Sequence, residues 1–410
     1  MNGVFFFLVA SAFVVAGWHQ LAQIGEAPMA ALASSAVKAA EAAVTLGLGL
    51  IGSMALFLGL MKVAEAAGLL GALARVLRPV LHKLFPEVPV DHPAMGAMVM
   101  NVAANVLGLS NAATPFGVRA MQELEELNPN KGTASNAMVT FLALNTANVT
   151  LLPTHVMALR AAVGSHDAAA IIPTTLFATL WAAGCAILAA KFAAGWFPLP
   201  VVAATAPAGR QQGGWLMPGV LGLAVLGILP LTLWAGRDLS PWILPSMFVL
   251  VLGGGMLKGV AVYEIFVEGA KEGLAISLRI IPYLVAILAA VAMFRDSGAM
   301  DLLMAPLARL TTPLGAPPEA LTMAGLRSLS GSASFGYLSA LLKDPAIGPD
   351  GYLGMLLSTI YGSSETTFYV LAVYFGAAGV RRIRHALLVG LLADLAGLVF
   401  SVIICSWLYR

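Results

Sequence analysis

Charged residues are scarce in this chain of 410 residues, where Asp, Glu, Lys and Arg together make up 10% of the sequence. Hydrophobic residues make up 60%, and the mean hydropathy is +0.89. A typical soluble protein is roughly 25% charged and under half apolar, so this chain lacks the polar surface needed to face water. The composition excludes a soluble enzyme and a disordered chain, and a net charge of +2 supplies no field that attracts nucleic acid. The chain is therefore predicted to lie in a membrane.

Motifs of enzymes and metal sites are also missing. The sequence has no HExxH, no GxSxG elbow, no Walker loop and no GxGxxG that opens a βαβ unit. The two cysteines, Cys185 and Cys405, lie far apart in apolar stretches and fit neither a metal-ligand spacing nor a disulfide framework. We expect no enzyme activity, no cofactor and no resident metal.

Long apolar stretches give the predicted membrane crossings. A spanning helix needs about 20 apolar residues, and the candidates are 3–18, 44–62, 169–191, 215–236, 241–258, 279–295 and 385–408. The first lacks the basic start of a cleaved signal and is predicted to be retained. The 42 Gly and 23 Pro residues exceed what plain spanning helices need, which favours helices that are broken within the membrane.

Two parts of the chain repeat each other. LGLSNAATPFG near residue 110 corresponds to LRSLSGSASFG near residue 330, and FLALNTANVTLLP (141–153) corresponds to LLSTIYGSSETTFYV (356–370). Each copy ends in a long apolar helix, which indicates an internal duplication. We predict a first repeat over 1–200, a linker with one extra helix over 201–240, and a second repeat over 241–410.

Basic residues indicate how the copies are oriented. The loop 163–168 carries no Lys or Arg, whereas the equivalent loop of the second copy carries Arg381, Arg382 and Arg384. By the positive-inside bias, the copies enter the membrane with opposite polarity. We place residues 1, 62–83, 192–214, 258–279 and 379–384 in the cytoplasm, and 19–38, 163–168, 237–240 and 295–318 outside. The predicted location is a bacterial inner membrane, with the N-terminus cytoplasmic.

Polar residues interrupt four segments that are otherwise apolar enough for membrane depth. Inverted repeats with discontinuous helices are typical of secondary transporters, whose sites lie where the breaks meet. We predict re-entrant hairpins over 94–127 and 320–342. Helices over 134–162 and 352–378 are predicted to unwind midway, at Asn145–Thr150 and Gly362–Thr367. The predicted fold is an all-α polytopic membrane protein with two inverted repeats.

The polar centres of the two copies supply the candidate site. The predicted solute-binding residues are Asn105, Ser110, Asn111, Asn145 and Asn148 from the first copy, and Ser330, Ser332, Ser334, Ser363, Ser364, Glu365 and Thr366 from the second. Amides and hydroxyls both donate and accept, which suits a neutral or zwitterionic solute better than a bare ion. Asn148 and Glu365 occupy corresponding places in the two copies.

Glu365 is the best candidate for an ion-coupling residue, with Arg327 as its nearest counter-charge. An ionisable group at mid-depth is costly unless it is paired or used, so coupling to H⁺ or Na⁺ is expected. A purely structural Glu365–Arg327 pair is the alternative, just as the serines and asparagines could merely cap broken helices. Asp394 is a weaker candidate, and His155 is more typical of a helix-packing residue.

The quoted segments resemble a known family. NVLGLSNAATPFGVRAM (105–121) and GSSETTFYVLAVYFG (362–376) are similar to the nucleoside recognition, or Gate, domain family, and the chain looks like a fusion of its spore maturation protein A and B members. The resemblance covers nearly the whole length. It implies a multi-pass inner-membrane protein that moves a small solute.

These observations predict a secondary transporter of a small polar solute, such as a nucleoside, an amino acid or peptide, or an organic acid. The alternatives are a non-transporting membrane scaffold or assembly factor, and a passive channel or lipid translocator. The expected partners are membrane lipid and the solute, with no nucleic acid. Assembly into a homo-oligomer stays open.

Overall fold

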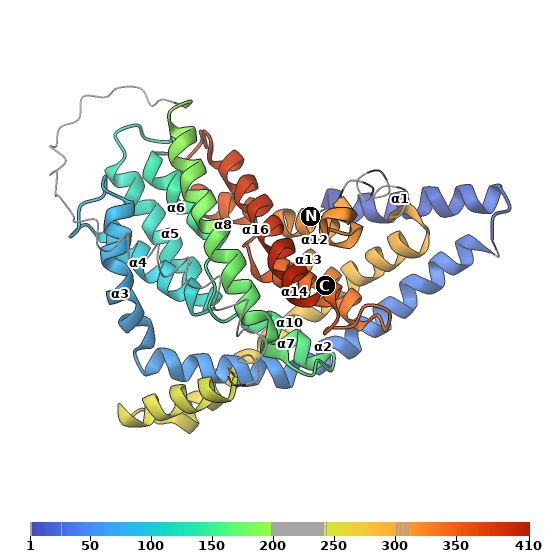
Figure 1. Cartoon of the computed structure of the whole chain (residues 1–410), viewed down its shortest axis with the longest axis horizontal. Coiled ribbons are helices and arrows are strands. Elements are labelled where there is room, and N and C mark those ends of the chain that lie inside the picture. The colour runs from blue at the N-terminus through green and yellow to red at the C-terminus, as the bar shows by residue number, and fades with distance from the viewer. Residues whose placement is uncertain are drawn as a thin grey trace.

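A computed structural model describes residues 2–25, 27–197, 242, 244–300, 302, 306, 309 and 311–410. The predicted linker and extra helix over 201–240 lie outside these residues. Within them the chain is almost entirely helical and forms no β-strand; Thr133 and Arg382 make one isolated bridge. The all-α prediction is therefore confirmed (Figure 1).

The first repeat is a series of helices whose two central pairs are interrupted. Its elements are α1 Asn2–Leu21, α2 Pro28–Ala66, α3 Leu69–Leu84, α4 Pro93–Val106, α5 Ser110–Leu127, α6 Asn136–Ala147, α7 Thr154–Ala162, η1 Ala168–Ala170 and α8 Ile171–Ala194. Local chemistry sets several starts: Pro93 opens α4, and the Ser135 hydroxyl accepts a bond from the Met138 N–H at the start of α6.

The second repeat follows the same order. Its elements are α10 Val262–Asp296, η2 Thr312–Leu314, α12 Pro318–Leu329, α13 Gly331–Lys343, α14 Tyr352–Gly362, α15 Thr367–Val370, the π-helix η3 Leu371–Phe375 and α16 Ala386–Tyr409. The hairpins α4–α5 and α12–α13 match the predicted 94–127 and 320–342, and the predicted breaks separate α6 from α7 and α14 from α15. The first break begins at Asn148, three residues later than predicted, because helix α6 continues through Ala147.

Equivalent helices of the two repeats pack antiparallel. The Tyr409 hydroxyl at the end of α16 donates to the Ala170 carbonyl beside the start of α8 (3.4 Å), while His385 at the start of α16 stacks on Phe197 beyond the end of α8. Helices α2 and α10 are likewise antiparallel, since Gly47 approaches Ile281 whereas Gly59, further along α2, approaches Phe266, which comes earlier in α10. Opposite direction of matching helices is the arrangement that an inverted repeat requires.

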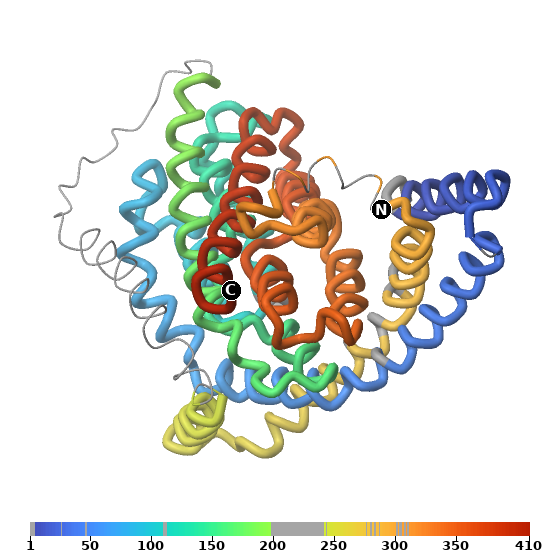
Figure 2. Tube along the Cα trace, turned by 45° about the vertical axis from the view of Figure 1, so that its right-hand side comes forward, coloured from blue at the N-terminus to red at the C-terminus, as the bar shows by residue number. Residues whose placement is uncertain are grey.

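Small residues let α2 and α10 approach closely. A Cβ added at Gly273 would lie 2.7 Å from the backbone of Ala55, and one added at Gly269 would lie 2.6 Å from the Leu58 carbonyl oxygen. Such small-residue contacts are common between membrane helices, whose backbones pack by van der Waals contact. Both views show α1 and the beginning of α2 at one end, beyond the bundle formed by α4–α8 and α12–α16 (Figures 1 and 2).

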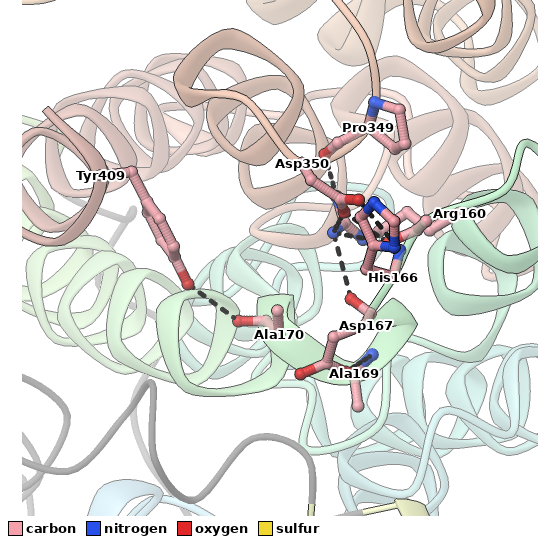
Figure 3. A network of polar contacts seen from close by, with 9 residues as sticks. Arg160, His166, Asp167, Ala169, Ala170, Pro349, Asp350 and Tyr409 are labelled. Atoms are coloured by element: carbon pink, nitrogen blue, oxygen red, sulfur yellow. Dashed lines mark hydrogen bonds and ion pairs between the residues drawn. The ribbon is translucent and has the colours of Figure 1, made fainter.

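Loops of one repeat are also fastened to loops of the other. Arg160 at the end of α7 donates to Asp350 (2.9 Å) and to the Pro349 carbonyl in the loop before α14 (Figure 3). The equivalent loop of the second repeat pairs with the first in turn, because the Arg381 and Arg382 N–H groups donate to the Gly132 carbonyl. We call the first of these junctions the Arg160 clasp.

Several helices have the length and composition of membrane spans. Among the described residues they are Pro28–Ala66, Ala168–Ala194 and Ala386–Tyr409, with shorter apolar helices at Phe5–Leu21 and Leu244–Leu257. The chain is a multi-pass membrane protein of helices. The segments between the predicted spans are partly helical: 19–38 contains the start of α2, 62–83 contains most of α3, and 258–279 contains the start of α10. The side of the membrane on which each lies stays a prediction. Helix α2 has 39 residues and is about 58 Å long at 1.5 Å each. This length exceeds the apolar bilayer thickness, so part of the helix, with polar residues, extends beyond the apolar layer.

Candidate functional site

The two helix breaks meet each other directly. The Glu365 N–H donates to the Thr146 carbonyl at 2.7 Å, and the Asn148 Nδ2 donates to Glu365 Oε1 at 3.1 Å. Asn148 ends α6 in the left-handed region, with φ +35°, a conformation that Asn tolerates better than most residues. The unwound middles of the two repeats therefore lie together, as the duplication predicted.

Each hairpin tip packs against the break of its own repeat. In the first repeat, the Leu151 N–H donates to the Val106 carbonyl at 2.8 Å, and Asn105 Nδ2 donates to Asn145 Oδ1 at 2.9 Å. In the second, Arg327 donates to the Ser364 carbonyl and, at 3.4 Å, to the Thr366 hydroxyl. These bonds satisfy backbone groups that unwinding would otherwise leave unpaired at membrane depth.

A cavity of about 430 Å³, its open part included, lies at this junction. Both repeats contribute to it. Its lining consists of Asn105, Gly108, Asn148, Thr150, Leu152, Pro153, Thr154, His155, Val156, Arg327, Tyr361, Gly362 and Glu365. Polar side chains make up more than half of this lining, so the cavity offers several hydrogen-bond donors and acceptors to a bound molecule.

The Arg327–Glu365 ion pair neutralises its two charges but stays partly accessible from the cavity. Arg327 and Glu365 approach to 3.5 Å, with 7% and 34% of their side chains exposed. The Arg327 guanidinium also lies 4.3 Å from the centre of the Tyr361 ring. The arginine is thus fixed by protein on several sides, whereas the Glu365 carboxylate keeps a face toward the cavity.

Polar atoms at the break remain without partners. Asn148 Oδ1 and the Thr146 hydroxyl oxygen are buried and accept or donate no hydrogen bond to any described residue. An unpaired buried polar atom costs about 1–3 kcal/mol. The site therefore has hydrogen-bonding capacity that a bound solute or water can use.

The predicted site residues take several different places in the structure. Asn105, Asn148, Glu365 and Arg327 line the cavity. Asn145 is buried behind it, where it accepts bonds from Asn105 and from the Tyr374 hydroxyl. The serines mostly serve the backbone: Ser330 accepts from the Ala333 N–H and pairs with Ser332, while Ser334 and Ser363 bond to carbonyls of their own helices. Ser364 and Thr366 hold Arg327, and the side chains of Ser110 and Asn111 lie outside the described part of the structure.

Tyr361 and Thr154 line the cavity without having been predicted. The signal for Tyr361 is its place immediately before Gly362, where the repeated pattern predicts the break. His155, interpreted from the sequence as a packing residue, also lines the cavity. Among the described residues no cluster of His, Cys, Asp or Glu could hold a metal ion.

Asp394 forms a second polar centre nearby, in the middle of α16. Its Oδ2 accepts bonds from the Ser328 hydroxyl at 2.5 Å and from the Thr367 hydroxyl at 2.7 Å. Ser328 belongs to the last turn of α12 and Thr367 is the first residue of α15. The carboxylate therefore connects a hairpin arm and a helix break to the long helix.

Comparison with known proteins finds a matching family model and two proteins of similar sequence. The family described as "Nucleoside recognition" (Gate) matches residues 47–162. Spore maturation protein A of Bacillus subtilis (strain 168) is 48% identical over 143 residues, which cover 35% of this chain and 73% of that protein. Spore maturation protein B of the same organism is 45% identical over 168 residues, which cover 40% of this chain and 93% of that protein. This chain belongs to the spore maturation protein A and B family.

The two matches are consistent with a fusion of an A-like and a B-like part, as the resemblance implied. The Gate match, residues 47–162, runs from the middle of α2 to the end of α7 and so includes α6 and α7, the broken pair of the first repeat. A solved "Structure of CNTnw in an inward-facing substrate-bound state" has a TM-score of 0.48 and 15% sequence identity, and covers 99% of this chain and 90% of that one.

Proposed function

We propose that the protein is a secondary transporter of a small polar solute, with a nucleoside-like compound as the first candidate and amino acids, peptides and organic acids as the others. The observation that carries the proposal is the joined pair of breaks, in which Asn148 of one repeat binds Glu365 of the other beside a cavity. The family description, nucleoside recognition, supports the first candidate.

The chemistry of the cavity favours a solute rich in hydroxyl and amide groups. Asn105, Asn148 and Thr150 offer donors and acceptors, Glu365 accepts, and the aromatic face of Tyr361 is already covered by Arg327. Asn148 Oδ1 has no partner and can accept from a solute hydroxyl. A bare ion would find one carboxylate that Arg327 already neutralises.

Coupling is assigned to Glu365. Its carboxylate is shared between the two repeats, so a proton or Na⁺ on it alters the bond that joins the breaks. Weakening this bond lets the hairpin tips move relative to the cavity, which alternating access requires. Location in a bacterial inner membrane with a cytoplasmic N-terminus belongs to the same proposal.

A membrane scaffold is the second candidate. The serines that cap α13 or bond within their own helices favour it, because they need no solute to be satisfied. The partly exposed Glu365 and the unpaired Asn148 Oδ1 favour transport.

Uptake into proteoliposomes tests the proposal. Purified full-length protein is reconstituted, and labelled uridine, adenosine, alanine and succinate are offered under an imposed H⁺ or Na⁺ gradient. We expect one solute class to accumulate, and Glu365→Gln to reduce gradient-driven uptake at least about tenfold, the effect of losing a charged hydrogen bond. Glu126→Gln, on the exposed face of α5, is the matched control and keeps full uptake.

Two results contradict the proposal. Absence of flux for every solute under either gradient favours the scaffold. Flux that ignores the gradient and is unchanged in Glu365→Gln indicates a passive channel. Size-exclusion profiles of both variants establish that the altered proteins are folded.

A further inference from the structure

Asp394 is nearly enclosed by protein, with 9% of the residue exposed, and only one of its oxygens is hydrogen-bonded. Oδ2 accepts from Ser328 and Thr367, whereas Oδ1 is buried and has no partner among the described residues. The Ser364 hydroxyl lies near the carboxyl group without meeting hydrogen-bond geometry. A fully ionised carboxylate with an unsatisfied oxygen is costly at membrane depth.

The charges around Asp394 do not balance. Arg327 of α12 is the charged side chain that acts on Asp394, and the neighbouring α14–α15 segment carries the titratable residues Tyr352, Tyr361, Glu365 and Tyr369. Helix α6 has no titratable side chain, and α8 has Cys185 and, in its last turn, Lys191. Arg327 pairs with Glu365, and no described cation lies within ion-pair distance of Asp394. Two acids therefore share one guanidinium, which favours one of them carrying a proton.

We propose that Asp394 is a proton-binding site, separate from Glu365. The proton bonds to Oδ1, the oxygen that accepts no hydrogen bond from any described residue, and leaves to the aqueous phase when the carboxylate is restored. The cavity lining does not include Asp394, and two hydroxyls already occupy its Oδ2 at 2.5 and 2.7 Å. This arrangement suits a proton better than Na⁺, which needs several oxygen ligands around it.

Protonation changes what holds the second hairpin. The bonds from Ser328 and Thr367 are charge-assisted while Asp394 is ionised, and such bonds are roughly twice as strong as neutral ones. A proton on Asp394 therefore loosens the end of α12 and the start of α15 from α16. As a step in transport this rests on the proposed function, but the proton site itself does not.

Infrared difference spectroscopy of the reconstituted full-length protein tests the site. The protein is titrated from alkaline to acidic pH in potassium buffer without a solute gradient, and the carbonyl stretch of protonated carboxyl groups is recorded. We expect a buried carboxyl band that Asp394→Asn removes and Glu365→Gln retains. Because no transport is measured, a protein that moves no solute still shows the band.

Variants that retain the carboxyl group keep the proposal testable if Asp394→Asn fails to fold. Ser328→Ala and Thr367→Val each remove one donor to the carboxylate, and each is expected to move the midpoint of the band to higher pH by about one unit. Ser339→Ala removes a buried hydroxyl of α13 that bonds only to the Phe335 carbonyl, and it leaves the midpoint unchanged. A band that survives Asp394→Asn, or midpoints that do not move, overturn the proposal. Loss of the wild-type band when Na⁺ replaces K⁺ overturns it in favour of a sodium site.

Discussion

Asn148 donates a hydrogen bond to Glu365 over 3.1 Å, although 217 residues separate them in the chain. The two residues hold corresponding places in the two repeats, so this bond joins the two helix breaks. The Glu365 N–H adds a second link to the Thr146 carbonyl. A displacement of either break is therefore transmitted to the other, which a carrier with two inverted halves requires.

The Arg327–Glu365 pair should behave as a coupled unit. Arg327→Met removes the bonds to the Ser364 carbonyl and the Thr366 hydroxyl and leaves Glu365 without its cation. Breaking one side of a largely buried pair costs about 3–5 kcal/mol. The double variant Arg327→Met/Glu365→Gln should cost less than the sum of the single ones, because the uncompensated carboxylate is gone. Thermal unfolding of all four proteins measures the coupling, and strictly additive losses would contradict it.

Gly108 should resist substitution. It occupies the tip of the first hairpin with φ +74°, and an added Cβ would lie 2.2 Å from the Leu152 carbonyl oxygen. Gly108→Ala forces the hairpin tip away from the break, and we expect a loss of about 2–4 kcal/mol or failure to fold.

Gly96 provides the matched control for that substitution. It lies inside α4, and nothing is within 4 Å of an added Cβ. Gly96→Ala should leave the melting temperature unchanged or raise it slightly, because Ala favours the helix by about 0.5–1 kcal/mol. Equal melting temperatures for both variants would show that the hairpin tip does not pack on the break.

The sequence was sufficient for the order of hairpins and breaks, because duplicated polar runs interrupt apolar segments at the same places. It did not reveal the extent of α2, since Ser34, Ser35 and Lys38 resemble a loop although neighbouring alanines favour a helix. Packing against a long partner such as α10 is what stabilises α2 as one continuous helix.

The candidate site was predictable in composition but not in detail. Asn145 and Asn148 are three residues apart, yet Asn145 lies behind the cavity and Asn148 lines it. The left-handed turn at Asn148 decides which side chain faces inward, and composition does not determine such a turn. Tyr361 was not among the predicted site residues because aromatic residues are common in membrane helices.

Acid should weaken the Arg160 clasp. Burial raises the pKa of Asp350, but bonds from the Ser165 hydroxyl and the His166 N–H, with the charge of Arg160, outweigh burial and hold the pKa below its ordinary value. A carboxyl group whose pKa is lower in the folded state than in the unfolded chain stabilises the fold at pH values above the ordinary pKa, about 4. This stabilisation is lost as the pH falls through the pKa of the folded state.

Melting temperatures measured from neutral pH to about pH 3 test the clasp. Asp350→Asn should lose about 1 kcal/mol at neutral pH, a figure kept small because 35% of the side chain is exposed, and should lose less further stability on acidification than wild type. Asp91→Asn, at a side chain that is 99% exposed, is the control. Parallel acid curves for Asp350→Asn and wild type would exclude the clasp as a source of acid sensitivity.

Opposite orientation of the repeats predicts opposite exposure of equivalent loops. His166 and Arg381 are both exposed, and they follow the broken helices of the first and second repeats. In a background with both native cysteines replaced, His166→Cys should react with a membrane-impermeant maleimide on intact cells. Arg381→Cys should react only after the membrane is opened, since the cluster Arg381, Arg382 and Arg384 is predicted to be cytoplasmic. The two sites are read separately against a denatured sample that labels fully. Labelling of both positions from one side would mean that the two loops share a membrane face, and the inverted arrangement on which the transport proposal depends would fail.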